Sequence, residues 1–320
     1  MQFRKFILYL ILLAILVIPA TESSAVWVWT PDNNKWENPK YSVKETPAEQ
    51  LSYALTFYRA KRYKEAVREF NKLITHYPKA REAPEAQYYI GLCWEEQDKI
   101  YEAFKYYQVV IDKYPFSERS VEIVQREYKI GERLLENLDK QSAFIEALTG
   151  TNYTVIDVFK TVIKNAPYGP LAAPAQYKIG LYLSEQGLFQ EARDEFEKVV
   201  NDYPESEWAK AAKYQIGLAD AKRSTNSQYD QKITKSAVDE FKNFVKEYPD
   251  AELSAKAKDQ IHDLREKEAQ NNFIIAQFYE KQKNYKSAQI YYQTLVDNYK
   301  DSTWASKALE RMREITSKVQ

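Results

Sequence analysis

Hydrophobic and polar residues follow a helical period over residues 84–115. Gly91 and Trp94 fall on the apolar face of a first segment, and Ala103 and Tyr107 fall on the apolar face of a second. The small residues mark where the two segments approach each other closely. A proline closes the stretch, because it cannot donate the next helical hydrogen bond. The pattern predicts two amphipathic helices joined by a short polar turn.

This hairpin matches the tetratricopeptide repeat (TPR), a 34-residue helix–turn–helix with Leu-Gly, aromatic, Ala, aromatic and Pro at fixed places. One hairpin cannot bury its own apolar face, so neighbouring copies are expected. Six copies occur, at residues 47–78, 84–115, 130–167, 179–204, 216–249 and 275–300. The sequence therefore predicts an all-α fold, a right-handed TPR solenoid of about six helical hairpins plus a C-terminal capping helix.

Three features interrupt the regular spacing of the repeats. An insertion over residues 138–152 stretches the third repeat, and a polar insertion over 223–232 lies in the fifth. An additional helix is predicted over residues 252–268, leading directly into the sixth repeat. Insertions in repeat arrays map to loops on one face, which in some arrays is the binding face.

Residues 1–25 have the three parts of a secretory signal. Arg4 and Lys5 supply positive charge, residues 6–18 are apolar, and small residues precede a cleavage point after Ala25. A helix over the apolar run spans about 20 Å, short of the roughly 30 Å hydrocarbon core of a bilayer. Cleavage and export to the periplasm are therefore expected, and a retained N-terminal anchor is the alternative.

Residues 26–46 form a tryptophan-rich arm outside the repeats. Trp27 and Trp29 alternate with valines, a turn signal follows, and Trp36 is placed to return opposite them. The rings either cover the open end of the first repeat or dock a partner protein or cell-wall surface. The rest of the chain is grouped as repeats 1–3 over residues 47–170, and repeats 4–6 with the capping helix over 171–320.

Aromatic residues recur on the first helix of each repeat, two positions before the Leu/Ile position. In a solenoid this position is expected to point into the concave groove, where rings accept the apolar side chains of a bound peptide. The alternative is that each ring only packs against its neighbours. The candidate groove residues are Leu51, Tyr88, Tyr128, Tyr177, Tyr214 and Phe273.

Composition argues against several other functions. Basic and acidic residues are equal in number, so the net charge is zero and nucleic acid is not an expected partner. The single cysteine, Cys93, is interpreted as a buried structural thiol. The two histidines lie far apart without ligand-spaced companions. The sequence therefore predicts no catalytic residues, no cofactor and no metal site.

Three stretches resemble the BamD family, the TPR lipoproteins of the outer-membrane β-barrel assembly machinery. They are YPFSERSVEIVQREYKIGERLL, NAPYGPLAAPAQYKIGLYL and EAQNNFIIAQFYEKQKNYKSAQIYYQTLVDNYKDS. The likeness spans about residues 47–315. In the last stretch an additional helix feeds the terminal repeat, as it does in that family.

The resemblance implies a non-catalytic periplasmic scaffold that assists assembly and insertion of outer-membrane β-barrel proteins. Its partners would be unfolded outer-membrane proteins, bound by the N-terminal repeats, and β-barrel assembly subunits, bound by the C-terminal repeats. No cysteine stands near Ala25 to carry the family's lipid. We therefore expect no lipid anchor, with peripheral membrane association or an uncleaved N-terminal helix in its place. A general periplasmic adaptor for cell-wall synthesis, cell division or secretion is the alternative function.

Overall fold

The computed structural model describes residues 27–30, 35–38, 42–136, 154–226 and 231–319. Thirteen α-helices and one two-stranded hairpin lie in these ranges. The hairpin is the only sheet of the described chain, and helices account for nearly all the rest. The predicted all-α repeat fold is confirmed.

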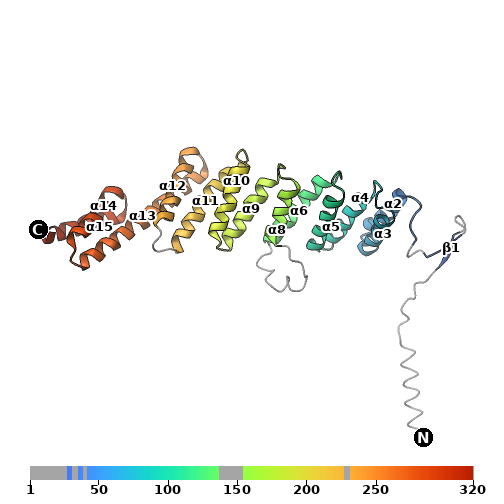
Figure 1. The fold of residues 1–320 in the computed structure, drawn as a ribbon, viewed down its shortest axis with the longest axis horizontal. Helices are drawn as coiled ribbons and strands as arrows, with labels where there is room; N and C mark the ends of the chain where they lie inside the picture. The colour runs from blue at the N-terminus through green and yellow to red at the C-terminus, as the bar shows by residue number, and fades with distance from the viewer. Residues whose placement is uncertain (1–26, 31–34, 39–41, 137–153, 227–230, 320) are drawn as a thin grey trace, which may run out of the picture. The chain divides into compact units, whose positions relative to one another are not determined.

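The chain divides into two units, residues 1–120 and 121–320. Figure 1 labels the helices of both units. In the first unit, successive helices pack side by side, each against the next. Its elements are β1 (Val28–Thr30), β2 (Lys35–Glu37), α2 (Pro47–Arg59), α3 (Tyr63–His76), α4 (Ala83–Glu95) and α5 (Ile100–Lys113). A capping box starts α2: Thr46 Oγ1 accepts from Glu49 N, and Glu49 Oε2 accepts from Thr46 N.

The second unit continues the same helix pairing. Its helices are α6 (Ser120–Glu136), which begins at the boundary, α8 (Val155–Asn165), α9 (Ala172–Glu185), α10 (Phe189–Asp202), α11 (Glu207–Asn226), α12 (Gln231–Glu247), α13 (Glu252–Lys281), α14 (Tyr285–Asn298) and α15 (Thr303–Val319). The division after residue 120 differs from the predicted grouping of 47–170 and 171–320, which stays a prediction. In a repeat array each repeat contacts only its neighbours, so no single boundary is strongly marked.

Two of the three interruptions can be compared with the structure. The additional helix predicted over 252–268 joins the first helix of repeat six in one continuous helix, α13. The polar insertion over 223–232 lengthens the helices on both sides, since α11 runs to Asn226 and α12 starts at Gln231. The insertion over 138–152 lies outside the described residues.

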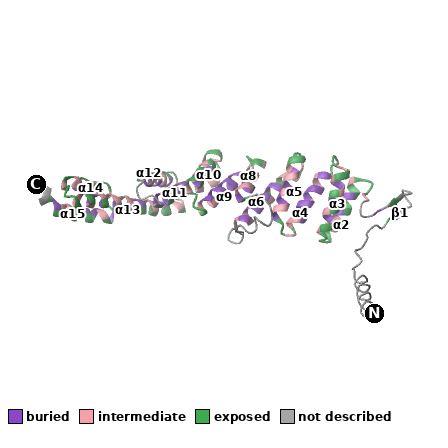
Figure 2. Ribbon diagram, turned by 60° about the horizontal axis from the view of Figure 1, so that its bottom comes forward, coloured by how far each residue is buried: buried purple, intermediate pink, exposed green. Residues whose placement is uncertain are grey.

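Each helix pair closes on one contact between an aromatic ring and a small residue. The ring comes from the second helix, and the small residue comes from the first. Figure 2 shows that buried positions recur along the helices of both units. In four repeats a Cβ on the glycine would lie within 2.8 Å of the ring. The four pairs are Gly91–Tyr107, Gly131–Phe159, Gly180–Phe196 and Gly217–Phe241. The first and sixth repeats instead bury Ala54 in a cluster with Phe70, and Ala276 in a cluster with Tyr292.

This contact can be tested at Gly180. An alanine Cβ there would lie 2.6 Å from Cε1 of Phe196. Overpacking costs about 1–3 kcal/mol, whereas alanine returns at most about 1 kcal/mol of helix propensity. We therefore expect Gly180→Ala to lower the free energy of unfolding by about 1 kcal/mol in urea denaturation.

The paired variant Phe196→Leu supplies the control. A smaller side chain opposite position 180 gives the new methyl group room, so Gly180→Ala should cost less in the Phe196→Leu background. A Gly180→Ala protein as stable as the parent would contradict the close contact.

Candidate protein-binding site

The predicted groove residues are mostly buried. Tyr88 is 2% exposed and Tyr177 is 8% exposed, and Tyr214 and Phe273 are buried to a similar degree. Tyr128 and Leu51 are half-buried. The five aromatic residues of this set are called the ladder below. The peptide-binding role of all six residues stays a prediction.

Five of these rings pack against the closing ring of their own repeat. The ring centroids lie 5.4–5.8 Å apart in the pairs Tyr88–Tyr107, Tyr128–Phe159, Tyr177–Phe196, Tyr214–Phe241 and Phe273–Tyr292. Tilted and edge-on pairs at such distances are favourable beyond the area that they bury. Burial also raises the pKa of the Tyr177 and Tyr214 hydroxyls, and it raises that of Tyr128 to about 12. The ladder therefore forms part of the repeat core.

A third group covers the ladder ring in three repeats. The Arg119 guanidinium lies 4.8 Å from the Tyr88 ring, and Trp208 lies 5.1 Å from Tyr177. Trp304 lies 5.2 Å from Phe273. In each case the covering residue stands 31 positions further along the chain. One repeat position thus supplies a cation or an indole to shield these rings.

Two other aromatic residues are almost fully exposed. Phe116 is 99% exposed and Tyr168 is 100% exposed. Each follows the proline that ends the second helix of its repeat. The four remaining repeats have a charged residue at this position, namely Lys79, Glu205, Asp250 and Asp301. Our sequence reasoning missed both residues, although an aromatic side chain at an otherwise charged repeat position was a detectable signal.

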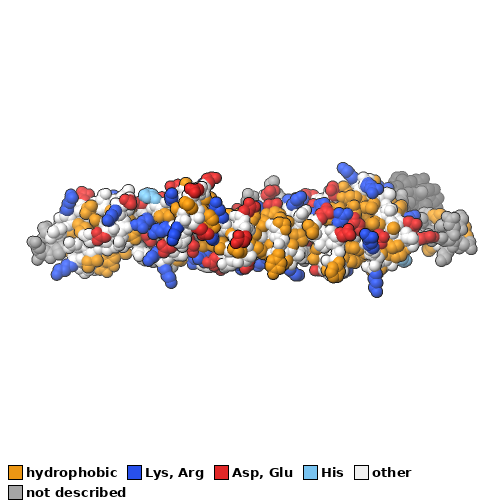
Figure 3. Space-filling model, turned by 90° about the horizontal axis from the view of Figure 1, so that it is seen from above, with side chains coloured by type: hydrophobic (Ala, Val, Ile, Leu, Met, Phe, Trp, Pro, Cys, Tyr) orange, Lys and Arg blue, Asp and Glu red, His pale blue; other side chains and the backbone are white. Residues whose placement is uncertain are grey.

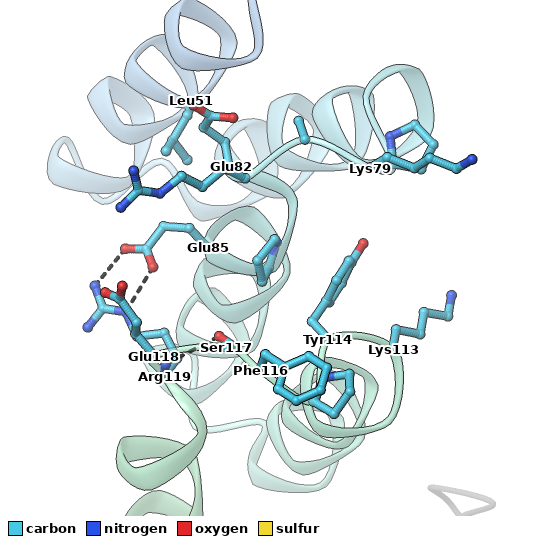
Figure 4. A pocket seen from close by; sticks show the side chains of 15 residues that line it. Leu51, Lys79, Glu82, Glu85, Lys113, Tyr114, Phe116, Ser117, Glu118 and Arg119 are labelled. Carbon is cyan, nitrogen blue, oxygen red and sulfur yellow. Dashed lines mark hydrogen bonds and ion pairs between the residues drawn. The ribbon is translucent and has the colours of Figure 1, made fainter.

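Phe116 lines a pocket in the first unit (Figure 4). The pocket has a volume of about 980 Å³ and lies between the loop after α3, the start of α4 and the loop after α5. Arg119 and Glu85 stand on one side, where Arg119 Nε and Nη2 donate to the Glu85 carboxylate at 2.8 and 2.6 Å. Tyr114, Lys113 and Phe116 stand on the other.

The charges around this pocket are mixed. Lys79, Arg81 and Lys113 are exposed and form no ion pair within the described chain. Glu82 and Glu118 stand among them. Basic and acidic side chains are interspersed in the same way over the face seen in Figure 3. An exposed ring beside mixed charges fits a polypeptide better than a polyanion, which would need cations alone.

A second exposed apolar surface lies on α13. Ile274 and Phe278, one helical turn apart, are each more than half exposed. They belong to the part of α13 that forms the first helix of repeat six. Sequence reasoning missed this pair as well, because only the core positions of the repeat were followed.

The arm forms the predicted hairpin. β1 and β2 pair antiparallel, with Trp29 opposite Trp36. Their rings meet edge to face with centroids 5.6 Å apart. Trp27, Trp29 and Trp36 are 58%, 41% and 62% exposed. The rings are therefore accessible to a partner, and the docking role stays a prediction.

The described residues offer little for catalysis. They contain no group of three or more His, Cys, Asp or Glu residues arranged to hold a metal. Cys93 is fully buried, and burial, followed by the charge of Glu96, raises the pKa of its thiol to about 12. The Ser224 hydroxyl lies 3.2 Å from Lys267 Nζ, but Ser224 is fully buried and also contacts Thr234 at 2.6 Å. A substrate cannot reach this serine, so the contact joins α11, α12 and α13 structurally.

Within the described chain, none of the helices combines the length and the apolar character needed to span a bilayer.

Two family models match parts of the chain. The tetratricopeptide repeat model matches residues 50–80, 85–117 and 174–206, which cover the pairs α2–α3, α4–α5 and α9–α10. The model named YfiO and described as outer membrane lipoprotein matches residues 214–320. None of the curated proteins compared with this chain matches it.

Several solved structures of TPR proteins are similar to parts of this chain at low identity. A TPR-repeat protein of Bacteroides fragilis is 16% identical, with a TM-score of 0.47, over 69% of this chain and 100% of that one. A thermophilic TPR protein of Thermus thermophilus is 13% identical, with a TM-score of 0.33, over 68% and 99%. YrrB, described as a TPR protein with an unusual peptide-binding site, is 16% identical, with a TM-score of 0.34, over 67% and 93%. The helices and the matched repeats make this chain an all-α TPR solenoid.

The packing role of the ladder predicts a contrast between two tyrosines of the second unit. Tyr177 is buried against Phe196 and Trp208, whereas Tyr168 is fully exposed. We expect Tyr177→Ala to lower the free energy of unfolding by about 3 kcal/mol and Tyr168→Ala to change it by less than about 0.5 kcal/mol. Urea denaturation followed by circular dichroism measures both, and equal effects would show that the ladder contributes nothing to the core.

Proposed function

We propose that this protein is a non-catalytic scaffold of the bacterial envelope that binds polypeptides during assembly of outer-membrane β-barrel proteins. The observation that carries the proposal is the match of residues 214–320 to the outer membrane lipoprotein family model. The matched region contains the continuous helix α13 and the terminal repeat that follows it. This feature is the most telling part of the resemblance to the BamD family. TPR arrays also bind other proteins generally, which agrees with a scaffold role.

A partner subunit is proposed to dock on the C-terminal repeats through Ile274 and Phe278. An exposed aromatic and aliphatic pair on a rigid helix has the character of an interface hot spot, because burying it excludes water at little cost in conformational entropy. The pair lies within the matched region. The partner would be the barrel-forming subunit of the assembly machinery.

Unfolded client proteins are proposed to bind in the first unit at the pocket around Phe116. The pocket volume is in the range of sites that hold a few side chains. The pocket borders Tyr88 through Arg119, whose guanidinium both shields the ring and pairs with Glu85. A client segment would place an apolar side chain against Phe116.

The envelope location is proposed from the N-terminal segment together with the family match. Residues 1–25 carry the export signal pattern. Absence of a cysteine near Ala25 argues against the lipid that the matched family's description implies. The protein would then be periplasmic and held at the membrane in another way.

The subunit contact is tested by co-purification from cells that express the tagged full chain. We expect the barrel-forming subunit to co-purify with the parent chain. The amount recovered should fall about tenfold with Phe278→Ser, because a central aromatic anchor contributes about 1.4 kcal/mol or more to binding. Ile290→Ser is the matched control, since Ile290 is 65% exposed on the neighbouring helix α14. Recovery of cell-wall synthases in place of that subunit would contradict the proposal and favour the adaptor function.

The client contact is tested by titrating a fluorescent peptide from the C-terminal strand of an outer-membrane β-barrel protein. Phe116→Ser should weaken binding about tenfold, since the ring is the main apolar group that the pocket exposes. Tyr168→Ser is the control, because it removes an equally exposed ring from the corresponding loop of the second unit. Equal binding by both variants and the parent would exclude the Phe116 pocket as the client site.

A further inference from the structure

The tryptophan hairpin presents one face made of indole rings. Trp29 and Trp36 are paired across the two strands, so their side chains lie on the same face. Trp27 stands two residues before Trp29 and falls on that face by the alternation of an extended chain. Val28, on the opposite face, is 46% exposed. The hairpin thus carries three indoles on one side, and all three are open to water.

An uncovered indole face on so small an element requires a partner. A two-stranded hairpin is marginally stable in water on its own. Exposed aromatic groups gathered on one face mark an interaction surface more often than isolated ones do. Indole has a large apolar body and one N–H donor, a combination that favours the boundary between hydrocarbon and water. The chemistry of the face therefore suits an interface with one apolar side and one wet side.

Charge and chain continuity point to a lipid bilayer as that partner. Residues 26–46 contain three basic residues, Lys35, Lys40 and Lys44, and three acidic residues, Asp32, Glu37 and Glu45. The arm therefore has no net charge with which to select an acidic or a basic protein. The apolar run over residues 6–18 lies a short distance before Trp27 in the sequence. That run brings the chain to a membrane during export. Among the described residues, the indoles lie closest to this run along the sequence.

We propose that the hairpin of β1 and β2 is a membrane-interface anchor that places Trp27, Trp29 and Trp36 among the lipid headgroups. The contact would supply the membrane attachment for which this chain has no lipidated cysteine. It depends on indole partition rather than on charge, so zwitterionic lipid suffices. The inference goes beyond the scaffold function and stands independently of the client and subunit sites.

The full chain provides a direct test through its own fluorescence. It contains six tryptophans, of which three lie in the hairpin and three in the repeats. Replacing Trp94, Trp208 and Trp304 by phenylalanine leaves the hairpin as the only source of indole emission. Trp94 tolerates this change well, because its buried Nε1 donates no hydrogen bond. The variant is mixed with phosphatidylcholine vesicles, either plain or brominated on the acyl chains near the headgroup.

We expect the hairpin emission to move to shorter wavelength on vesicles and to fall about twofold when the lipid is brominated, because bromine quenches only indoles at that depth. Replacing a third of the lipid by phosphatidylglycerol should leave the quenching unchanged, since the arm has no net charge. An anchor over residues 1–25 would by itself hold Trp27 near the headgroups. The quenching that tests the proposal is therefore that of Trp29 and Trp36, measured with Trp27→Phe added to the variant.

Trp27→Ser, Trp29→Ser and Trp36→Ser combined give the matched control. This variant keeps the three repeat tryptophans, and its emission should be the same on plain and brominated vesicles. The proposal would be overturned if brominated lipid did not quench the hairpin emission while iodide dissolved in the water still did. A lipid-independent shift that grows with protein concentration would also overturn it, in favour of contact between two copies of the chain.

Discussion

The structure depends on one recurring contact, an aromatic ring of the second helix lying directly against a glycine or alanine of the first. The missing side chain allows the two helix backbones to approach until the ring fills the space between them, at the density of a protein interior. A buried polar side chain one turn earlier joins the same two helices: Gln50 Nε2 donates to Glu69 O at 3.0 Å, and Gln87 Nε2 donates to Tyr106 O at 3.3 Å. The first two repeats are therefore each closed by one apolar and one polar contact at corresponding positions.

The same contact explains where the ladder of first-helix aromatics lies. Each ladder ring stands three residues before the small residue, so it meets the closing ring from the side and becomes buried with it. Trp208 in α11 and Trp304 in α15 then cover the ladder, each from the helix that follows the repeat. Most of the ladder surface is thus used in folding. Phe116 and Tyr168, which are almost fully exposed, lie outside the ladder in loops between helices.

Several departures from the repeat pattern lie at the surfaces proposed for binding. Phe116 stands where most repeats have a charge, and Phe278 is exposed on a helix whose other face is packed. The tryptophan hairpin belongs to no repeat. Residues that follow the repeat pattern contribute to the stability of the fold. An exposed apolar residue that departs from the pattern does not, and a binding function is the physical explanation that we give for Phe116, Phe278 and the tryptophans.

The sequence alone determined the fold class, the positions of the helix pairs, the glycines at their contacts and the strand pairing of the arm, because each depends on spacing within one or two neighbouring elements. It also indicated that an additional helix leads into the sixth repeat. Only the tertiary structure decided which aromatic rings are buried. A tyrosine two positions before the Leu/Ile position has the same local pattern whether it lines an open groove or packs beneath an indole 31 residues away. Burial is a property of everything that surrounds a side chain, and a period of three or four residues carries no information about a neighbour from the next repeat.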